Sequence, residues 1–383
     1  MKFKMKFKCP YCYGVHDMRA SGVKCSYNVP GKTSSCYKKV EKDASGWIAE
    51  GDKISCLKCT EAQKQVYCGI INKPIPKDFW ESDSKSDFFN GDNLSIALIG
   101  AKATGKSNYI GVLINEIRRK MLGPFNASLK LTVCPESWAY YGSYYFKPLF
   151  EEGFVIGVTA QGEIPPLIFP LNFMNKRDKI TKSAILTFYD TAGENLDSEK
   201  NILTNNRYIP NADGIILLLD PLQVPSIRAK LEGKIPLPRK NTDVVEVLSR
   251  VVQNIREVHN VRGTIKKHLA LVFTKIDALE TDNIIREDSC LRSESEHLSR
   301  GKFVRSDFES VNIEMRDVLE NWLDDEIIQL MKNFEKYSLF GVTALGAIPN
   351  GERISGEGIS PRRVLDPLLW LLAENKYIEV VKK

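Results

Sequence analysis

The sequence lacks the long apolar runs that mark exported or membrane-spanning chains. No stretch approaches the roughly 18 uninterrupted apolar residues needed to cross a bilayer. The opening MKFKMKFKCPYC alternates lysine with phenylalanine and methionine, and it has none of the apolar core of about 7 to 15 residues that a signal peptide needs. We therefore expect a cytoplasmic protein with no membrane span.

Histidine is also scarce, with 4 in 383 residues, and 7 of the 9 cysteines lie before residue 70. Without an export signal, disulfides are not the expected use of these cysteines. The segments CPYC and CLKC are two C-x-x-C knuckles, each of which can present two thiolates to a tetrahedral zinc ion. Because histidine ligands are scarce, although His16 is a candidate, a structural zinc is favoured over a catalytic one and over scattered free thiols. The expected ligands are Cys9, Cys12, Cys25, Cys36, Cys56, Cys59 and Cys68.

Charge follows the same division of the chain. Residues 1 to 80 hold 15 Lys and Arg against 7 Asp and Glu, whereas the remainder holds 39 against 41. Any attraction to nucleic acid therefore belongs to the N-terminal part, although a small metal-bound domain that is basic for solubility explains the charge equally well.

The pattern of apolar residues divides the chain into three parts. Residues 1–76 form the expected zinc-ribbon-like domain, 77–93 a linker rich in serine and aspartate, and 94–383 an α/β domain with insertions at about 125–160 and 278–306. Buried-strand runs at 94–100, 166–174, 183–189, 213–220 and 268–275 alternate with helical patterns at 106–121, 241–260, 307–335 and 364–375. This order predicts a doubly wound, mostly parallel sheet covered on both faces. The charged segment 280–306 is expected to be a solvated insertion.

The segment GAKATGKS, residues 100–107, matches the phosphate-binding pattern G-x-x-x-x-G-K-[ST] between a strand and a helix. Glycines there let backbone N–H groups converge on phosphate oxygens at a helix N-terminus, the lysine reaches the β and γ phosphates, and the serine binds Mg²⁺. The residues expected to contact the phosphates are Gly100, Lys102, Ala103, Thr104, Gly105, Lys106, Ser107 and Asn108.

Three further segments follow in the order that a GTPase requires. YDTAGE offers Asp190 for Mg²⁺ and the Gly193 N–H for the γ-phosphate. In FTKID, which begins at Phe273 and includes Thr274, the Asp277 carboxylate can accept from guanine N1–H and the 2-amino group, with the Lys275 stem along the base. Adenine lacks both donors, which argues against an ATP-driven enzyme. FGVTALG supplies Thr343, Ala344 and Leu345, whose N–H groups can meet guanine O6.

The four segments together resemble the translation-factor-related class of P-loop GTPases, to which Ras-like proteins belong. The cysteine knuckles, the enlarged stretch before YDTAGE and the closing RVLDPLLWLL resemble more narrowly the bacterial double-GTPase families, which are associated with conflict and antiviral defence gene clusters. The resemblance implies GTP/GDP, Mg²⁺ and Zn²⁺ as cofactors. Position 71 is Ile where a cysteine completing a knuckle after Cys68 is expected, which puts a second zinc in doubt.

The residues that control hydrolysis depart from the Ras-like pattern. Ser107 and Asp190 are 83 positions apart, so spacing does not identify the switch I threonine; Thr159, in a loop containing Gly and Pro, is the candidate. Glu194 stands where Ras-like proteins carry the glutamine that orients the attacking water. Lys102 either blocks a partner's arginine finger, supplies its charge, or points to solvent. These departures predict slow intrinsic hydrolysis.

Two classes of function remain. In the first, a GTPase switch hydrolyses GTP and regulates an unknown protein partner, with homo- or hetero-oligomers allowed. In the second, the zinc ribbon is a binding module for nucleic acid or protein, and the nucleotide domain binds GTP but rarely hydrolyses it.

Overall fold

A seven-stranded sheet forms the centre of the computed structural model. The structure describes residues 2–3, 6–17, 23–25, 47–50, 53–56, 64–66, 75–82, 93–100, 104–131, 133–157, 166–189, 208–239, 244–320, 326–356 and 358–382. In spatial order the strands are β10 (Ala127–Leu129), β11 (Leu167–Met174), β12 (Ile180–Phe188), β9 (Leu94–Gly100), β13 (Gly214–Leu219), β14 (Ile265–Phe273) and β16 (Phe334–Gly341).

Five neighbouring strands, from β12 to β16, run parallel, whereas β10 and β11 are added antiparallel at one edge. The β11–β12 connection is a tight hairpin because the Asn175 side chain accepts hydrogen bonds from the backbone of Arg177 and Lys179, and Asp178 adopts a positive φ of 54°. The expected mostly parallel α/β sheet is confirmed.

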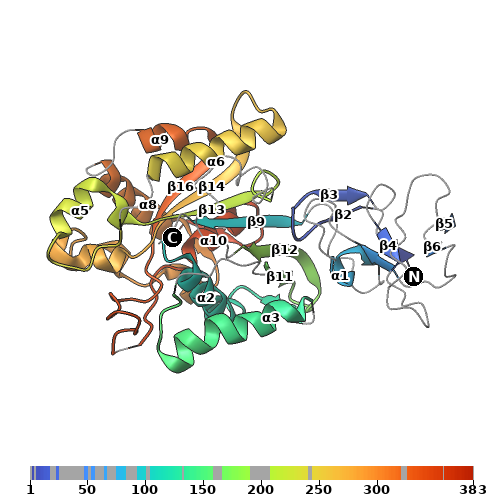
Figure 1. Ribbon diagram of the computed structural model, residues 1–383, viewed down its shortest axis with the longest axis horizontal. Helices are drawn as coiled ribbons and strands as arrows, with labels where there is room; N and C mark the ends of the chain where they lie inside the picture. The colour runs from blue at the N-terminus through green and yellow to red at the C-terminus, as the bar shows by residue number, and fades with distance from the viewer. Residues whose placement is uncertain are drawn as a thin grey trace.

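Side chains along β9 alternate between two apolar clusters, as the pleat of a strand requires. Ala97 and Ile99 join one cluster, and Ile96 and Leu98 join the other. Helices cover both faces (Figure 1). The face of Ile96 carries α2 (Lys106–Glu116), α3 (Pro135–Tyr141) and α10 (Asp366–Glu374); α2 continues into the π-helix η1 (Ile117–Met121), and α3 into η2 (Gly142–Glu152).

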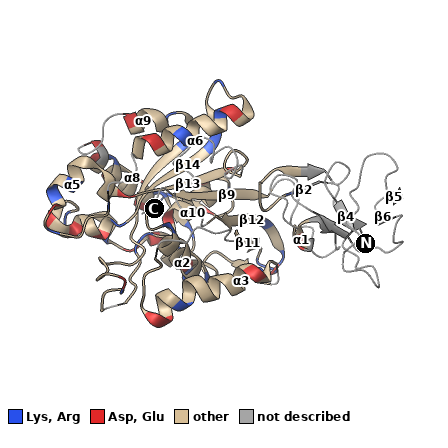
Figure 2. Cartoon of the chain, in the orientation of Figure 1, with Lys and Arg blue, Asp and Glu red and all other residues tan. Residues whose placement is uncertain are grey.

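The face of Ala97 is covered by α5 (Pro225–Leu231), α6 (Val244–His259), α9 (Glu326–Met331) and part of α8 (Arg305–Glu320). The shorter elements are η4 (Pro221–Gln223), η5 (Ile276–Asn283), η6 (Cys290–Arg292), α7 (Glu296–Arg300), β15 (Phe303–Val304) and β17 (Val380–Val381). Among the described residues, no helix combines the length and apolarity needed to span a membrane. Charged residues occur along α3, α5, α6 and α9 (Figure 2).

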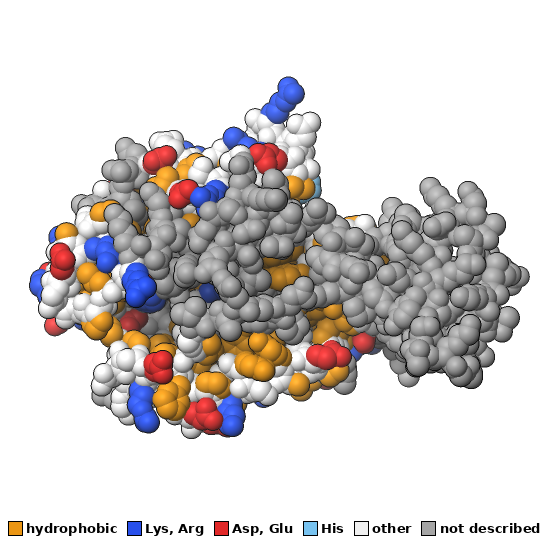
Figure 3. All heavy atoms as spheres, in the orientation of Figure 1, with side chains coloured by type: hydrophobic (Ala, Val, Ile, Leu, Met, Phe, Trp, Pro, Cys, Tyr) orange, Lys and Arg blue, Asp and Glu red, His pale blue; other side chains and the backbone are white. Residues whose placement is uncertain are grey.

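Hydrophobic side chains reach the surface along the lower edge of the molecule, where α3 and η2 lie (Figure 3). Tyr144 is 58% exposed, and its ring stacks on Tyr140 with centroids 4.2 Å apart. The helical spacing of aromatic residues in this region therefore serves packing on the inner side and leaves part of the outer side apolar.

The N-terminal part is built from two-stranded antiparallel sheets in the residues described. β1 (Lys2–Phe3) pairs with β8 (Glu81–Ser82), β2 (Lys6–Lys8) with β3 (Val15–Asp17), β4 (Val23–Cys25) with β7 (Lys64–Val66), and β5 (Trp47–Glu50) with β6 (Lys53–Cys56); α1 (Lys77–Trp80) precedes β8. The zinc-ribbon assignment stays a prediction. Cys9, Cys12, Tyr13 and Phe79 are nevertheless buried in the same cluster as Ala97, so this part packs against the central sheet.

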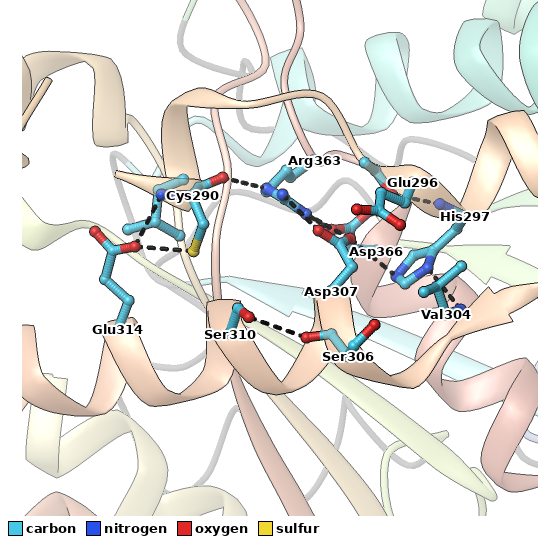
Figure 4. A network of polar contacts seen from close by, with 12 residues as sticks. Cys290, Glu296, His297, Val304, Ser306, Asp307, Ser310, Glu314, Arg363 and Asp366 are labelled. Carbon is cyan, nitrogen blue, oxygen red and sulfur yellow. Dashed lines mark hydrogen bonds and ion pairs between the residues drawn. The ribbon is translucent and has the colours of Figure 1, made fainter. Parts of the chain in front are cut away.

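The charged segment 280–306 differs from the solvated insertion that its sequence suggested. Leu291, His297 and Phe303 within it are buried. The physical reason is that apolar side chains of the segment, Leu291 and Phe303, pack into the two apolar clusters, and that Arg292 pairs with Glu280 at 3.0 Å inside the segment. Beside the segment, Arg363 donates to Asp307 at 2.9 and 3.0 Å and to Asp366 at 2.9 Å (Figure 4). His297, Asp307 and Asp366 bring ligand atoms within 4.8 Å of one another, but the Arg363 guanidinium pairs with both carboxylates, so the cluster is an ion-pair network.

Candidate nucleotide-binding site

The phosphate-binding segment lies between the end of β9 at Gly100 and the start of α2 at Lys106. A Cβ atom on Gly100 would lie 2.8 Å from Thr104 Oγ1 and 3.2 Å from Leu218 Cβ, so the loop can return close to the strand only with glycine there. Gly105 has a φ of 76°, in the left-handed region that favours glycine. Both glycines of the motif are therefore required by the backbone.

The N-terminus of α2 points its first N–H groups into this loop. Gly105 caps the helix without a side-chain hydrogen bond, and the first turn carries no acidic residue. Lys106, Ser107 and Asn108 are half-buried there. The N–H groups of a helix N-terminus and the positive end of the helix dipole favour an anion at such a position.

Lys106 already has a partner at the end of the neighbouring strand. Its Nζ donates to the Tyr189 carbonyl oxygen at 3.2 Å, and Tyr189 directly precedes the predicted Mg²⁺ ligand Asp190 in the sequence. The lysine is therefore held between the phosphate-binding segment and the start of the DTAG segment.

The base-binding side begins at the end of β14. Thr274 Oγ1 donates to the Thr104 carbonyl oxygen at 2.7 Å, which fastens the TKID segment to the phosphate-binding segment. Lys275 adopts a positive φ of 54°, and its Nζ lies 2.7 Å from Asp220 Oδ2. The Asp220 side chain is fully buried, and its Oδ1 also accepts from the Leu222 N–H at 2.9 Å. This ion pair fixes the direction of the lysine stem.

Asp277 is held beside the loop that follows β16. Burial raises the pKa of the Asp277 carboxyl above its ordinary value, while a hydrogen bond with the Thr343 side chain and the charge of Arg362 oppose that shift. Thr343 Oγ1 accepts from the Gly346 N–H at 2.9 Å, and the Thr343 backbone pairs with Arg362 in both directions. Asp277 is thus a partly buried carboxylate with a raised pKa, which makes it a candidate for binding a ligand that offers N–H groups.

A cavity of about 560 Å³ joins these segments. Its volume lies within the usual range for small-molecule sites, about 300 to 1,000 Å³. An apolar wall from Ile235 to Pro238 closes one side, and Ala347 to Pro349 lie near the TALG loop. The predicted site residues that line it are Thr104, Gly105, Asn108, Thr274, Lys275, Asp277, Thr343, Ala344 and Leu345.

The segment before Thr159 is fastened to α2. The Asn108 side chain accepts from the Ile156 N–H at 2.9 Å and donates to the Ile156 carbonyl oxygen at 3.4 Å. Val155 also lines the cavity. The chain therefore passes the start of α2 three residues before Thr159, which itself lies outside the described residues.

Other predicted residues also fall outside the part of the chain that the structure describes. They are Lys102, Ala103, Asp190, Gly193 and Glu194 of the nucleotide site, together with Cys36, Cys59 and Cys68. For Cys25 and Cys56, the backbone alone is described, in β4 and β6. Their assignments stay predictions.

Cys9 and Cys12 lie in a buried turn, and their assignment as zinc ligands stays a prediction. Both side chains are buried, and the Tyr11 N–H donates to Cys9 Sγ at 3.4 Å, which orients the sulfur. Two thiolates at C-x-x-C spacing fit half of a tetrahedral zinc site, and the other ligands would come from cysteines outside the described residues.

Sequence reasoning missed two residues that the structure connects to the site. Asp220 follows six consecutive buried residues of β13, and a carboxylate at the end of such a strand was a usable signal. Tyr189 was noticed as part of YDTAGE, but its hydroxyl contact with the backbone of Tyr11 crosses 178 positions and has no local signature.

Comparison with known proteins agrees with this geometry. A curated protein of Mycolicibacterium smegmatis, described as "Putative ESX-1 scaffolding and assembly protein SaeC", is 25% identical over 327 residues, which cover 79% of this chain and 78% of that protein. The match supports common ancestry over most of both chains.

Among solved structures, the GTPase-like domain of S. cerevisiae Ski7 bound to GTP aligns with 74% of this chain at 15% identity and a TM-score of 0.34. This chain covers 50% of that chain. The Arl6 BBS3 small GTPase of Trypanosoma brucei, with a bound nucleotide analogue, aligns with 75% of this chain and 99% of its own at 13% identity and a TM-score of 0.32. At these scores the fold assignment depends on the strand order and directions described above.

The family model named Double-GTPase 2 matches residues 94–327, more than half of the chain. This region contains the phosphate-binding segment, the DTAG segment and the TKID segment. The match supports a GTP-binding protein, and the chain belongs to the Double-GTPase 2 family.

Proposed function

We propose that the protein is a GTP-dependent switch that binds GTP with Mg²⁺, hydrolyses it to GDP and phosphate, and regulates a protein partner by the difference between the two states. The observation that supports it best is the convergence of Lys275, Asp277 and the Thr343–Leu345 loop with the start of α2 around one cavity. This arrangement offers a site for the base and a site for the phosphate anion in one cavity, and a guanine nucleotide would occupy both.

Mg²⁺ binding is assigned to Ser107 and Asp190, with Thr159 as the residue that senses the γ-phosphate. The hydrogen bonds between Asn108 and Ile156 support this assignment because they bring the chain beside Ser107 shortly before Thr159. When bound, the metal neutralises phosphate charge. Ordering of Thr159 and of residues 191–208 by GTP then gives the partner a surface that hydrolysis removes.

Hydrolysis itself requires an oriented water. The water oxygen attacks the γ-phosphorus, the bond from that phosphorus to the β–γ bridging oxygen breaks, and the water proton ends on the released phosphate. A Glu194 carboxylate about 5 Å from phosphate charge meets repulsion of order 3 kcal/mol at an effective dielectric of about 20. Turnover by the isolated protein is therefore well below about one per second, and a partner or an oligomer that repositions Glu194 raises it.

Base selection is the decisive test of nucleotide identity. Asp277→Asn should weaken GTP binding by about 2 to 4 kcal/mol, because a charge-assisted pairing is lost and the new amide N–H group faces the N–H donors of guanine. Xanthosine triphosphate should recover much of the loss, since its 2-oxo group accepts from the new amide. Titration of both proteins with ATP, GTP and XTP measures this, and wild-type preference for ATP would refute the assignment.

Single-turnover hydrolysis tests the switch. Slow release of phosphate that accelerates with a partner supports it. Fast turnover by the monomer that disappears in Glu194→Ala would show instead that the carboxylate already positions the water and that no external activation is needed.

The alternative function is a zinc-dependent binding module at the N-terminus with a nucleotide domain that rarely turns over. The C-x-x-C spacing of Cys9 and Cys12 and the basic composition of residues 1–80 favour it. Elemental analysis of protein purified without chelator, followed by nucleic-acid binding of the full chain with and without zinc, tests this. The association with antiviral defence stays a prediction, and the relative's role in scaffolding and assembly suggests a multiprotein complex as the setting of the switch.

A further inference from the structure

The segment Cys9–Gly14, here called the knuckle, forms a closed turn. The Cys9 N–H donates to the Gly14 carbonyl oxygen at 2.9 Å, and the Tyr13 N–H donates to the Cys9 carbonyl oxygen at 3.0 Å. Tyr13 adopts a positive φ of 55° and is 1% exposed. The turn therefore projects a tyrosine into the protein instead of towards solvent.

The knuckle docks on the pair of strands that carries the phosphate site. Tyr13 Oη accepts from the Thr187 N–H at 3.1 Å and lies 2.8 Å from the Ile96 carbonyl oxygen, to which it donates. Thr187 Oγ1 donates to the Pro10 carbonyl oxygen at 2.8 Å. Ile96 belongs to β9 and Thr187 to β12, so the knuckle fastens these two parallel strands to each other; Figure 1 shows β2 and β3, which flank it, beside β9.

The knuckle also holds residues on both sides of segment 190–207. The Tyr189 hydroxyl donates to the Tyr11 carbonyl oxygen at 2.6 Å, and Asn211 Nδ2 donates to the Cys12 carbonyl oxygen at 2.9 Å. The Tyr189 and Tyr208 rings stack with centroids 4.2 Å apart, and Tyr13 meets Tyr208 edge to face at 6.3 Å. The chain thus enters and leaves the DTAG segment through residues that the knuckle contacts.

These contacts continue into the phosphate site, because the Tyr189 carbonyl oxygen accepts from Lys106 Nζ and its peptide leads directly to Asp190. Resting on the proposed function, we propose that the knuckle is part of the GTPase machinery: through Tyr13 and Tyr189 it positions Lys106. Tyr189 is a positioning residue that acts through this lysine. By linkage, nucleotide binding stabilises the docked knuckle, and docking of the knuckle strengthens nucleotide binding.

Tyr377 provides a matched control for a general loss of stability. The Tyr377 hydroxyl also bridges β9 and β12, accepting from the Leu94 N–H at 3.0 Å and donating to the Ser183 carbonyl oxygen at 3.1 Å. It does so at the opposite ends of these strands, away from Gly100 and Tyr189. Loss of either hydroxyl removes similar hydrogen bonds, but only one lies on the route to Lys106.

The test compares Tyr13→Phe, Tyr189→Phe and Tyr377→Phe in the full chain. Affinity for a fluorescent GTP analogue is measured with Mg²⁺ and with EDTA, beside the thermal midpoint. We expect Tyr13→Phe and Tyr189→Phe each to weaken Mg²⁺-dependent GTP binding about 5- to 10-fold, the effect of one hydrogen bond. Tyr377→Phe should shift the thermal midpoint by a similar amount and leave the affinity unchanged.

Hydrogen exchange provides the reciprocal readout. Addition of GTP and Mg²⁺ should slow exchange of the knuckle amides in the wild type and in Tyr377→Phe, and Tyr189→Phe should abolish most of that slowing. If the wild type binds GTP but all three variants bind equally well, or knuckle exchange ignores the nucleotide, the coupling is overturned while the proposed function stands. If the wild type binds no guanine nucleotide, the proposed function fails and the coupling fails with it.

Discussion

The base side and the phosphate side of the cavity are held in different ways. At the base side, Lys275 pairs with Asp220 and Thr274 bonds to Thr104, so strand ends of the central sheet fix one another. At the phosphate side, Lys106 depends on the Tyr189 carbonyl, and Tyr189 depends on the backbone of residue 11. The predicted base side is thus held by strand ends of the sheet, whereas the predicted phosphate side is held in part by a distant part of the chain.

The largest effect is expected from the phosphate side. Lys106→Ala should weaken binding of GTP and GDP by about 3 kcal/mol, roughly a hundredfold, because charge-assisted hydrogen bonds to phosphate are lost. Lys120→Ala, which removes an exposed lysine paired with Glu116 further along the same helical run, is the control and should bind normally. Isothermal titration measures both; equal affinity for the two variants would contradict the assignment of the phosphate site.

The second prediction concerns the glycine where the two sides meet the sheet. Gly100→Ala places a Cβ 2.8 Å from Thr104 Oγ1, so the free energy of unfolding should fall by about 1 to 3 kcal/mol. Gly123→Ala has no atom within 4 Å of its new Cβ and should change little. Denaturant unfolding compares them, and an unchanged midpoint for Gly100→Ala would mean that the loop does not return as close to β9.

The third prediction tests whether the ion pair between Lys275 and Asp220 positions the base side of the cavity. Asp220→Asn keeps an acceptor for the Leu222 N–H but removes the charge that holds Lys275, so GTP affinity should fall about 10-fold, the worth of about 1.4 kcal/mol. Glu246→Gln breaks an exposed pair with Arg250 and should have no effect, as surface pairs contribute little. If Asp220→Asn binds GTP as the wild type does, the lysine is not positioned by this pair.

The smallest effect is the response to mild acid. Asp277 must be ionised to accept from guanine, and burial raises its pKa, so GTP affinity should begin to fall at a pH above the range where an ordinary aspartate protonates. Below the pKa of the free protein the loss approaches about tenfold per pH unit. XTP binding by Asp277→Asn, which lacks the carboxyl, should show a much weaker decline over the same range; parallel curves would assign the pH dependence elsewhere.

The raised pKa of Asp277 affects the stability of the fold in the opposite direction to GTP affinity. A carboxyl whose pKa is higher in the folded than in the unfolded protein stabilises the fold at low pH, and that contribution is lost as pH rises through the folded-state pKa. Asp277→Asn should therefore not lower the thermal midpoint at neutral pH, even though it weakens GTP binding.

Much of the lining of the cavity could be predicted from the sequence because its residues follow buried strands. Mostly apolar runs such as LSIALIG and GIILLL predict buried strands. Parallel strands bring their carboxyl ends to one edge of the sheet. The loops after β9, β14 and β16 therefore had to meet. By contrast, the docking of the knuckle depends on backbone acceptors, which carry no residue preference. The buried side chains of segment 280–306 were not expected because the sequence shows its charges but not that Leu291 and Phe303 pack into the two apolar clusters of the sheet.

The knuckle has a consequence for biosynthesis. Its hydrogen bonds to Thr187, Tyr189 and Asn211 join residues 174 to 199 positions apart, so the full set forms only after Asn211 has left the ribosome. At translation rates of about 5 to 20 residues per second, Cys9 and Cys12 wait roughly 10 to 40 seconds before their binding surface exists. During that interval two thiols that are buried in the finished protein are open to metals and oxidants, and the nascent chain closes its phosphate site through one of its longest loops.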